Sequence, residues 1–193
     1  IPDSVTSIGD YTFFSCVSLT TITIPDSVTS IGDVAFAGCD DLTSITIPDS
    51  VTSIGDRAFL LCESLTAINA DSDNKYYASE DGVLFNKDKS VLVLYPMGKT
   101  AKKYVMPDGV TTIGNNAFYR CNNLTSITIP DGVTTIGNKA FASCDNISSI
   151  TISDSVTSIG DDVFNYCGNL TFINVDSDNK YYASEDGVLF NKD

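Results

Sequence analysis

Six cysteines are the residues of this sequence with the widest chemical range, since a thiol can form a disulfide, bind a metal ion or act as a nucleophile. They recur every 23 residues within two groups of three: Cys16, Cys39, Cys62, Cys121, Cys144 and Cys167. An even number of cysteines in a secreted chain favours disulfides. Regular spacing instead predicts stacked side chains that point the same way, whereas a disulfide needs converging Cβ atoms. We therefore expect buried, reduced, structural thiols.

The sequence contains no histidine, which removes the commonest general base and the commonest transition-metal ligand. A Cys–His or Ser–His catalytic pair therefore cannot be assembled from these residues. The cysteines also lack the closely paired C-x-x-C spacing of zinc sites. We expect no catalytic residue, no metal site and no cofactor.

Aspartate recurs at one fixed position as well, where it could hold a weakly bound Ca²⁺ or cap a turn in solvent. These residues are Asp3, Asp26, Asp49, Asp108, Asp131 and Asp154, and we favour turn caps. The stretch DSDNKYYASEDG places Asp71 and Asp73 like the first ligands of an EF-hand loop. It fails as such a loop, because Lys75 replaces a ligand, Tyr76 replaces the required glycine and no glutamate ends it.

Charge narrows the range of partners. The chain carries 25 acidic and 11 basic residues, a net charge of −14. Without a basic stripe, nucleic acid is not an expected partner, and anionic membrane surfaces are disfavoured for the same reason. No apolar run approaches the ~18 residues of a membrane span. The composition predicts a highly soluble, solvated exterior.

Internal repeats decide the architecture. The stretch IPDSVTSIGD and its variants open repeats at residues 1–23, 24–46 and 47–69, and again at 106–128, 129–151 and 152–174. An insert occupies 70–105, and a truncated insert occupies 175–193. The stretch DSDNKYYASEDGVLFNKD, called the duplicated segment below, occurs at 71–88 and unchanged at 176–193. Recent duplication explains that identity as well as a functional demand does. We expect residues 1–193 to form one continuous solenoid, part of a longer repetitive protein.

Each repeat predicts one coil of that solenoid. The residues that occupy the same position in successive repeats form a column, and eight columns are apolar. Leu42–Pro48 alternates like a short parallel strand. Asp56 is placed to cap a short helical turn in which Ala58, Phe59 and Cys62 share one face. A single coil cannot offset its own ordering entropy, so stacking must stabilise it.

The insert predicts a β-hairpin, with apolar runs at Val83–Phe85 and Val91–Tyr95 around a polar loop. Lys103–Pro107 then restores the strand register, with Tyr104 and Met106 inward. The insert is either a spacer or a projecting aromatic patch made of Tyr76 and Tyr77 with Tyr95. In its truncated copy, Val188–Phe190 would be an exposed edge strand, open to self-association.

Two surfaces are candidate binding sites. One is the outward face of the predicted strands: Thr21, Thr23, Ser44, Thr46, Ala67, Asn69, Ser126, Thr128, Ser149, Thr151, Phe172 and Asn174. The other is the aromatic patch of the inserts: Tyr76, Tyr77, Tyr181 and Tyr182. A Thr-x-Thr ladder can bind ice, but the breaks at Ala67/Asn69 and Phe172/Asn174 argue against that use.

The pattern C-x-x-L-x-x-I-x-I-P-x-x-V-x-x-I-G-x-x-A-F resembles the repeat of BspA-type (treponemal-type) leucine-rich repeat proteins. The stretch DGVLFNKD…YP is similar to an insert often found between such repeats in bacterial surface proteins. The resemblance covers essentially the whole chain. It implies a parallel-stranded solenoid, an extracellular location, a role in adhesion or protein binding, and no shared catalytic residues.

Two functions remain open on this sequence. The first is an adhesion module that binds a protein or glycan on another cell or on matrix, without catalysis. The alternative is a passive stalk that sets distance within a larger surface protein. Uniform outward residues favour the stalk, whereas the insert tyrosines and Phe172 favour binding.

Overall fold

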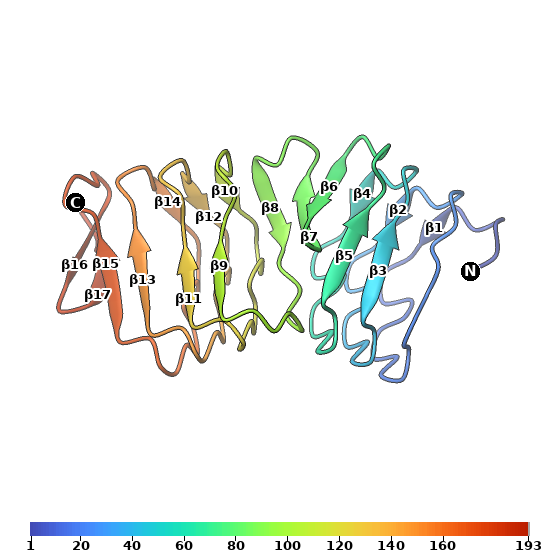
Figure 1. Cartoon of the computed structure of the whole chain (residues 1–193), viewed down its shortest axis with the longest axis horizontal. Helices are drawn as coiled ribbons and strands as arrows, with labels where there is room; N and C mark the ends of the chain where they lie inside the picture. Colours follow the sequence, from blue (N-terminus) through green and yellow to red (C-terminus); the bar gives the residue numbers. More distant parts are fainter. Residues whose placement is uncertain (193) are drawn as a thin grey trace. The chain divides into compact units, whose positions relative to one another are not determined.

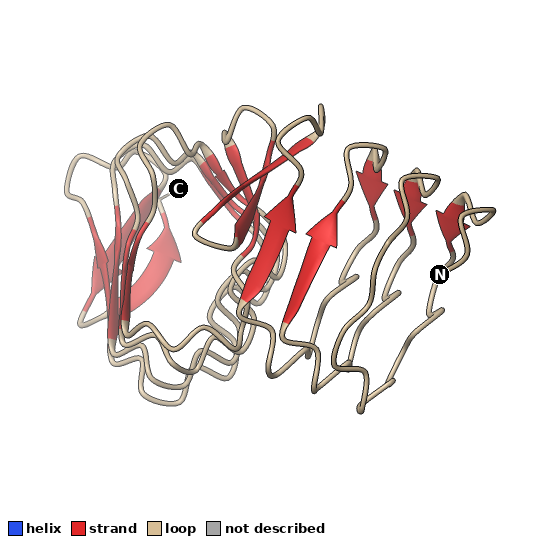
Figure 2. Cartoon of the chain, turned by 45° about the vertical axis from the view of Figure 1, so that its right-hand side comes forward, coloured by secondary structure: helices blue, strands red, loops and turns tan. Residues whose placement is uncertain are grey.

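Each repeat folds into short strands joined by tight turns, and successive repeats stack in register. The computed structural model describes residues 1–192. They form two compact units, one of Ile1–Lys89 with Leu94–Lys99 and one of Ser90–Val93 with the residues from Thr100 onward. Figure 1 labels the strands of each unit, and Figure 2 shows the chain built from strands and loops. The predicted repeat solenoid is confirmed by this stacking. Its continuity through the insert stays a prediction.

Two sets of parallel strands, rather than the predicted single set, line the repeats. The first unit pairs β1 (Ser7–Ile8), β2 (Ser30–Ile31) and β4 (Ser53–Ile54), and separately β3 (Ser44–Ile47) and β5 (Ala67–Ala70). The second unit pairs β8 (Val91–Leu94), β10 (Thr112–Ile113), β12 (Thr135–Ile136) and β14 (Ser158–Ile159). It also pairs β9 (Lys103–Val105) with β11 (Ser126–Thr128), and β13 (Ser149–Ile152) with β15 (Phe172–Val175). The strands of two residues went unpredicted because they are too short to show alternation.

The apolar columns form the core, as predicted. Ile31, Phe36 and Leu42 of the second repeat are buried. The phenylalanine rings stack from repeat to repeat, with centroids 5.1 Å apart for Phe13–Phe36 and 5.5 Å apart for Phe36–Phe59. Each repeat therefore buries its apolar face mainly against its neighbours, as the entropy argument requires.

Turns replace the predicted short helical turn, and no helix occurs in residues 1–192. Two residues per repeat explain this, because they adopt left-handed φ values: Val34 at 58° and Gly38 at 72° in the second repeat, for example. A left-handed residue interrupts a right-handed helix. Alternate N–H groups then donate to the next repeat, from Val34 to Asp56 O at 2.9 Å and from Phe36 to Ala58 O at 2.8 Å.

Aspartate serves these turns differently from the prediction. Asp56 was expected to cap its own turn. Instead, the N–H of Asp56 donates to Oδ1 of Asp33 in the preceding repeat, at 2.8 Å. The same bond joins the N–H of Asp33 to Asp10. The carboxylate column thus links repeats to one another.

Each insert contains a β-hairpin. In the first copy, β6 (Tyr77–Glu80) pairs antiparallel with β7 (Val83–Asn86). The two turn residues, Asp81 and Gly82, have φ values of 49° and 74°, as a type I′ turn requires. In the second copy, β16 (Tyr182–Glu185) pairs with β17 (Val188–Asn191) in the same way. The sequence predicted the runs that become β7 and β8 but missed β6. The register of Lys103–Val105 against Ser126–Thr128 is confirmed.

Candidate functional site

Cysteine side chains form hydrogen bonds to backbone carbonyl groups of the preceding repeat, which is a structural role. All six cysteines are thiols. The Sγ atom of Cys62 donates to Phe36 O at 3.1 Å, and that of Cys144 donates to Phe118 O at 2.9 Å. Burial raises the pKa of both thiols to about 12 and that of Cys39 to about 11. The expectation that all six are buried is wrong for Cys16, which is exposed, and for Cys167, which is only half-buried.

We expect a thiol reagent at neutral pH to label Cys16 at least about tenfold faster than the other five cysteines, because only a thiolate reacts and burial disfavours it. Mass spectrometry of the native chain, sampled over time, measures the five rates separately from that of Cys16. The Cys16→Ser variant should lose the fast phase and keep the slow one. Rapid labelling of Cys62 or Cys144 would contradict the prediction.

The outward strand positions are solvent-facing in both units, each unit carrying its own set. Those of the first unit include Ser44 opposite Ala67 and Thr46 opposite Asn69. In the second unit, Ser149 lies opposite Phe172 and Thr151 opposite Asn174. The remaining predicted positions are Thr21, Thr23, Ser126 and Thr128, of which Ser126 is half-buried and the others are exposed. Thr21 and Thr23 lie in a segment that forms no strand.

A groove of about 190 Å³ opens beside these hydroxyls in the first unit. Thr23 and Thr46 line it together with the carboxylates of Asp26 and Asp71. Its apolar lining is Ile22, Ile24 and Pro48. The groove is smaller than the ~300–1,000 Å³ of sites for drug-sized ligands, so it suits a single side chain of a partner.

Tyr95, predicted to share the aromatic patch, is buried instead. The four other predicted tyrosines divide into two kinds. Tyr76 and Tyr181 are 51% and 50% exposed. Tyr77 and Tyr182 are half-buried, and their hydroxyls accept the N–H groups of Ile54 and Ile159, both at 2.9 Å. Burial raises the pKa of the Tyr77 hydroxyl. Only the first tyrosine of each pair is therefore available to a partner.

A buried asparagine, which the sequence analysis missed, fixes the exposed tyrosine. Asn74 is fully buried. Its Nδ2 donates to Pro48 O at 2.6 Å and to Val51 O at 3.0 Å. Its Oδ1 accepts the N–H groups of Tyr76 and Tyr77, both at 2.8 Å. Asn179 repeats this arrangement for Tyr181 and Tyr182. The repeat register could have identified Asn74 from the sequence, because this residue follows Val51 by 23 residues and stands in a valine column.

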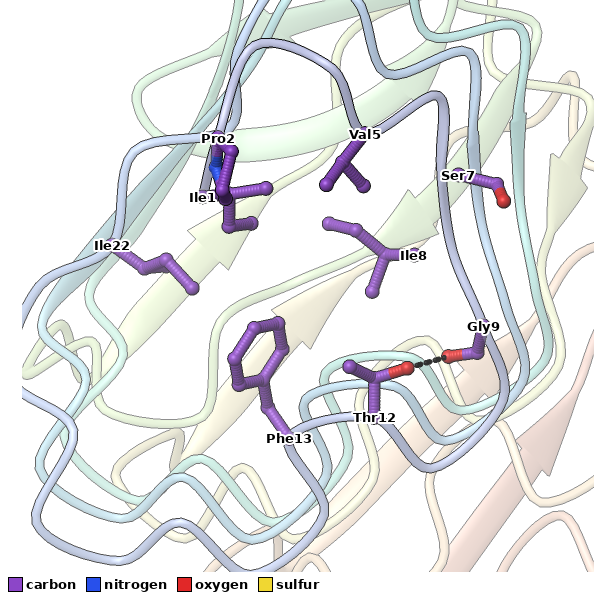
Figure 3. Close-up of a pocket in the computed structure, with 9 residues that line it drawn as sticks. All are labelled: Ile1, Pro2, Val5, Ser7, Ile8, Gly9, Thr12, Phe13 and Ile22. Carbon is purple, nitrogen blue, oxygen red and sulfur yellow. Dashed lines mark hydrogen bonds between the residues drawn. The ribbon is translucent and has the colours of Figure 1, made fainter.

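A larger pocket, of about 380 Å³, lies at the first repeat. Figure 3 shows that core-column side chains, including Ile8, Phe13 and Ile22, converge on it. The Thr12 hydroxyl beside them donates to Gly9 O at 2.7 Å. The lining is mainly apolar, and its polar side-chain groups are the hydroxyls of Ser7 and Thr12.

Within residues 1–192, no group of three or more His, Cys, Asp or Glu side chains is placed to hold a metal ion. The same residues contain no helix long and apolar enough to cross a membrane.

These features define a class of protein: a repeat solenoid built from stacked 23-residue coils. A model of the BspA type leucine-rich repeat region matches six copies over residues 1–82 and 97–186. The chain therefore belongs to the BspA-type leucine-rich repeat family.

Solved structures agree with that assignment. A leucine-rich repeat protein of Eubacterium ventriosum is 33% identical, with a TM-score of 0.70 over 90% of this chain and 58% of its own. A leucine-rich cell surface protein of Faecalibacterium prausnitzii is 34% identical, with a TM-score of 0.68 over 90% of this chain and 52% of its own. A leucine-rich repeat protein of T. pallidum is 29% identical, with a TM-score of 0.54 over 86% of this chain and 72% of its own.

This chain thus spans just over half the length of the first two relatives. No curated protein matches it. The family and the description of the second relative favour a protein-interaction role and a surface location, and leucine-rich repeat solenoids are generally non-catalytic.

Proposed function

We propose that this chain is an extracellular adhesion module that binds a protein or glycan on another cell or on matrix, and that it performs no catalysis. The observation that carries the proposal is the presentation of Tyr76 and Tyr181. Each ring is half exposed, yet the backbone beneath it is clamped by a buried asparagine.

Rigid, exposed tyrosines suit binding for a physical reason. A tyrosine offers a large amphipathic contact area at a low cost in side-chain entropy, and a few such anchors usually carry most of the binding energy. A pre-ordered backbone lowers the cost of association further. Two identical anchors also allow a clustered ligand to bind with avidity, without any new contact.

The strand face supports this contact in a secondary way. Its hydroxyls give adaptable, individually weak hydrogen bonds. The groove bordered by Thr23, Thr46, Asp26 and Asp71 adds two carboxylates on an already acidic chain, which favours a cationic side chain of the partner. Phe172, exposed on β15, is the corresponding large contact residue in the second unit.

Self-association through β17 belongs to the same proposal. Val188 and Phe190 are exposed, whereas the identical residues of the first copy, Val83 and Phe85, are fully buried. An apolar strand of this kind is open to pairing with a second copy of the chain.

The passive stalk remains the second candidate. The specific observation in its favour is that the outward strand positions are nearly uniform, mostly Ser and Thr, whereas a tuned binding face varies from repeat to repeat.

We expect the double substitution Tyr76→Ser and Tyr181→Ser to reduce adhesion to host cells or matrix at least about tenfold, because it removes the two proposed anchors. The matched control is Tyr11→Ser, which removes a tyrosine outside the inserts that is somewhat more exposed than either anchor. Thermal melting should be the same in all three proteins. Unchanged adhesion in the double variant would reject the tyrosines as anchors, and no adhesion by the unsubstituted chain would favour the stalk.

A further inference from the structure

Each group of three repeats, called a block below, ends in strands that have no further repeat to pair with. In a parallel ladder, N–H and C=O groups on one side of a strand bond to the preceding repeat, and those on the other side point towards the next repeat. In the first block, for example, the N–H of Gly55 donates back to Ile31 O at 2.8 Å. Such outward groups on a last strand would be a template for another chain.

Side chains of the duplicated segment form hydrogen bonds with these outward backbone groups. The outward N–H of Ile54, on β4, donates to the Tyr77 hydroxyl at 2.9 Å. On β5, the N–H of Ala70 donates to Ser79 Oγ, also at 2.9 Å. In the turn between β3 and β4, two carbonyl groups of the last repeat accept hydrogen bonds from Asn74 Nδ2.

One backbone bond completes the arrangement. The N–H of Ile68, the other outward group on β5, donates at 2.9 Å to the carbonyl of Gly82 in the hairpin turn. The hairpin turn also lies tightly against β5, because a Cβ added at Gly82 would come within 2.8 Å of the Ala67 Cβ. Any larger residue at position 82 would push the hairpin away from the strand.

The second copy reproduces every one of these bonds. The N–H of Ile159 donates to the Tyr182 hydroxyl at 2.9 Å, and that of Val175 donates to Ser184 Oγ at 3.1 Å. The N–H of Ile173 donates to Gly187 O at 3.0 Å. Asn179 Nδ2 donates to Ser153 O and Val156 O, at 2.8 and 3.0 Å.

Register explains how the segment reaches these groups. Tyr77 and Asn74 each stand 23 residues after the repeat residue whose backbone they contact, Ile54 and Val51. The segment therefore begins as if it were a further repeat. Its side-chain oxygen and nitrogen atoms then form the hydrogen bonds that the backbone of a further repeat would form. After these contacts the chain turns back as a β-hairpin.

We propose that the duplicated segment is a cap, a sequence-specific terminator that ends both strand ladders of each three-repeat block and occupies the outward edges of their last strands, β4 and β5 in the first unit and β14 and β15 in the second. This role goes beyond adhesion and uses different residues from the proposed anchors. It also gives a reason for the repeated sequence, since Asn, Tyr, Ser and Gly are each needed at one place.

The test is amide hydrogen exchange on the full chain carrying Tyr77→Phe and Tyr182→Phe. Each substitution removes a hydroxyl acceptor and keeps the ring. We expect exchange at the amides of Ile54 and Ile159 to become about five- to tenfold faster, since one hydrogen bond is lost at each. Amides inside the ladders, such as that of Gly32, should keep their rates.

The matched control is Tyr76→Phe with Tyr181→Phe, the same chemical change one residue earlier on exposed rings. It should leave every rate unchanged. Equal exchange at Ile54 in both variants, or faster exchange spread over all amides, would overturn the assignment of these hydroxyls.

Closure of the strand edges can be tested by a separate measurement of self-association. Adding Ser79→Ala and Ser184→Ala to the Tyr77→Phe and Tyr182→Phe variant should free four outward N–H groups. Light scattering should then show stronger concentration-dependent association than in the unsubstituted chain, whose β17 edge is the same. A variant with four deprotected amides that scatters like the unsubstituted chain would reject edge closure. Adhesion depends on Tyr76 and Tyr181, so loss of adhesion in their serine variant with intact amide protection would leave the cap standing.

Discussion

Replacing Gly55 with alanine will destabilise the chain by about 3–4 kcal/mol or more, because the new methyl group would overlap the backbone of the preceding repeat. A Cβ at this position would lie 2.4 Å from Asp33 Oδ1, 2.5 Å from Asp33 N and 2.5 Å from Gly32 C. Two of these atoms belong to the backbone and cannot rotate away. The third belongs to the carboxylate that accepts the N–H of Asp56, so relief of the clash would break that bond.

The same column supplies the control. Gly9 occupies this position in the first repeat, and a Cβ there would meet only Thr12 Oγ1, at 3.5 Å. Urea unfolding should therefore give a much lower midpoint for Gly55→Ala and a nearly unchanged one for Gly9→Ala. Gly132→Ala, whose nearest contact would be 3.7 Å away, should be tolerated as well. Similar midpoints for Gly55→Ala and Gly9→Ala would show that repeat spacing is not set by this close approach.

The solenoid was predictable from the sequence because the same residue types recur in every repeat. Ile, Phe and Cys recur at fixed positions through six repeats, and Leu does so in five of them. Only stacking can bury columns of that kind. The strand at Ser44–Ile47 showed the alternation that marks a half-buried strand. The turn after Gly55 was not predictable in the same way. Its left-handed positions are filled by residues such as Val34 and Leu61, whose types do not favour positive φ.

The candidate site shows where residue type alone fails. Tyr76 and Tyr77 are adjacent and identical in type, so composition assigned both to one aromatic patch. The structure separates them, because Tyr77 lies in register with Ile54 and turns towards the repeat, whereas Tyr76 faces solvent. Extending the repeat register through the insert would have placed Tyr77 and Asn74 in core columns. A β-hairpin was predicted in the insert, but its strand Tyr77–Glu80 was missed, since that stretch carries no apolar alternation.

Substitution of Asn74 by alanine should cost about 3–5 kcal/mol, the second large effect expected for this chain. The side chain makes four hydrogen bonds, two as donor and two as acceptor, all to backbone groups. Alanine satisfies none of them, and each buried polar group left without a partner costs about 1–3 kcal/mol, less where water can enter. Urea unfolding measures the loss, with Asn69→Ala as the matched control, because Asn69 is an exposed asparagine on β5 of the same unit.

The Asn74→Asp variant tests the acceptor and donor hydrogen bonds of this side chain separately. Asn74→Asp keeps an acceptor for the N–H groups of Tyr76 and Tyr77 but removes the donor to Pro48 O and Val51 O, and it buries a charge at neutral pH. We expect it to be at least as destabilising as alanine above the pKa of the new carboxyl group. It should recover part of its stability in acid, where the protonated group can donate one hydrogen bond again. A loss below about 1 kcal/mol for Asn74→Ala, or equal losses for Asn74→Ala and Asn69→Ala, would mean that the buried amide does not hold the insert against the last repeat.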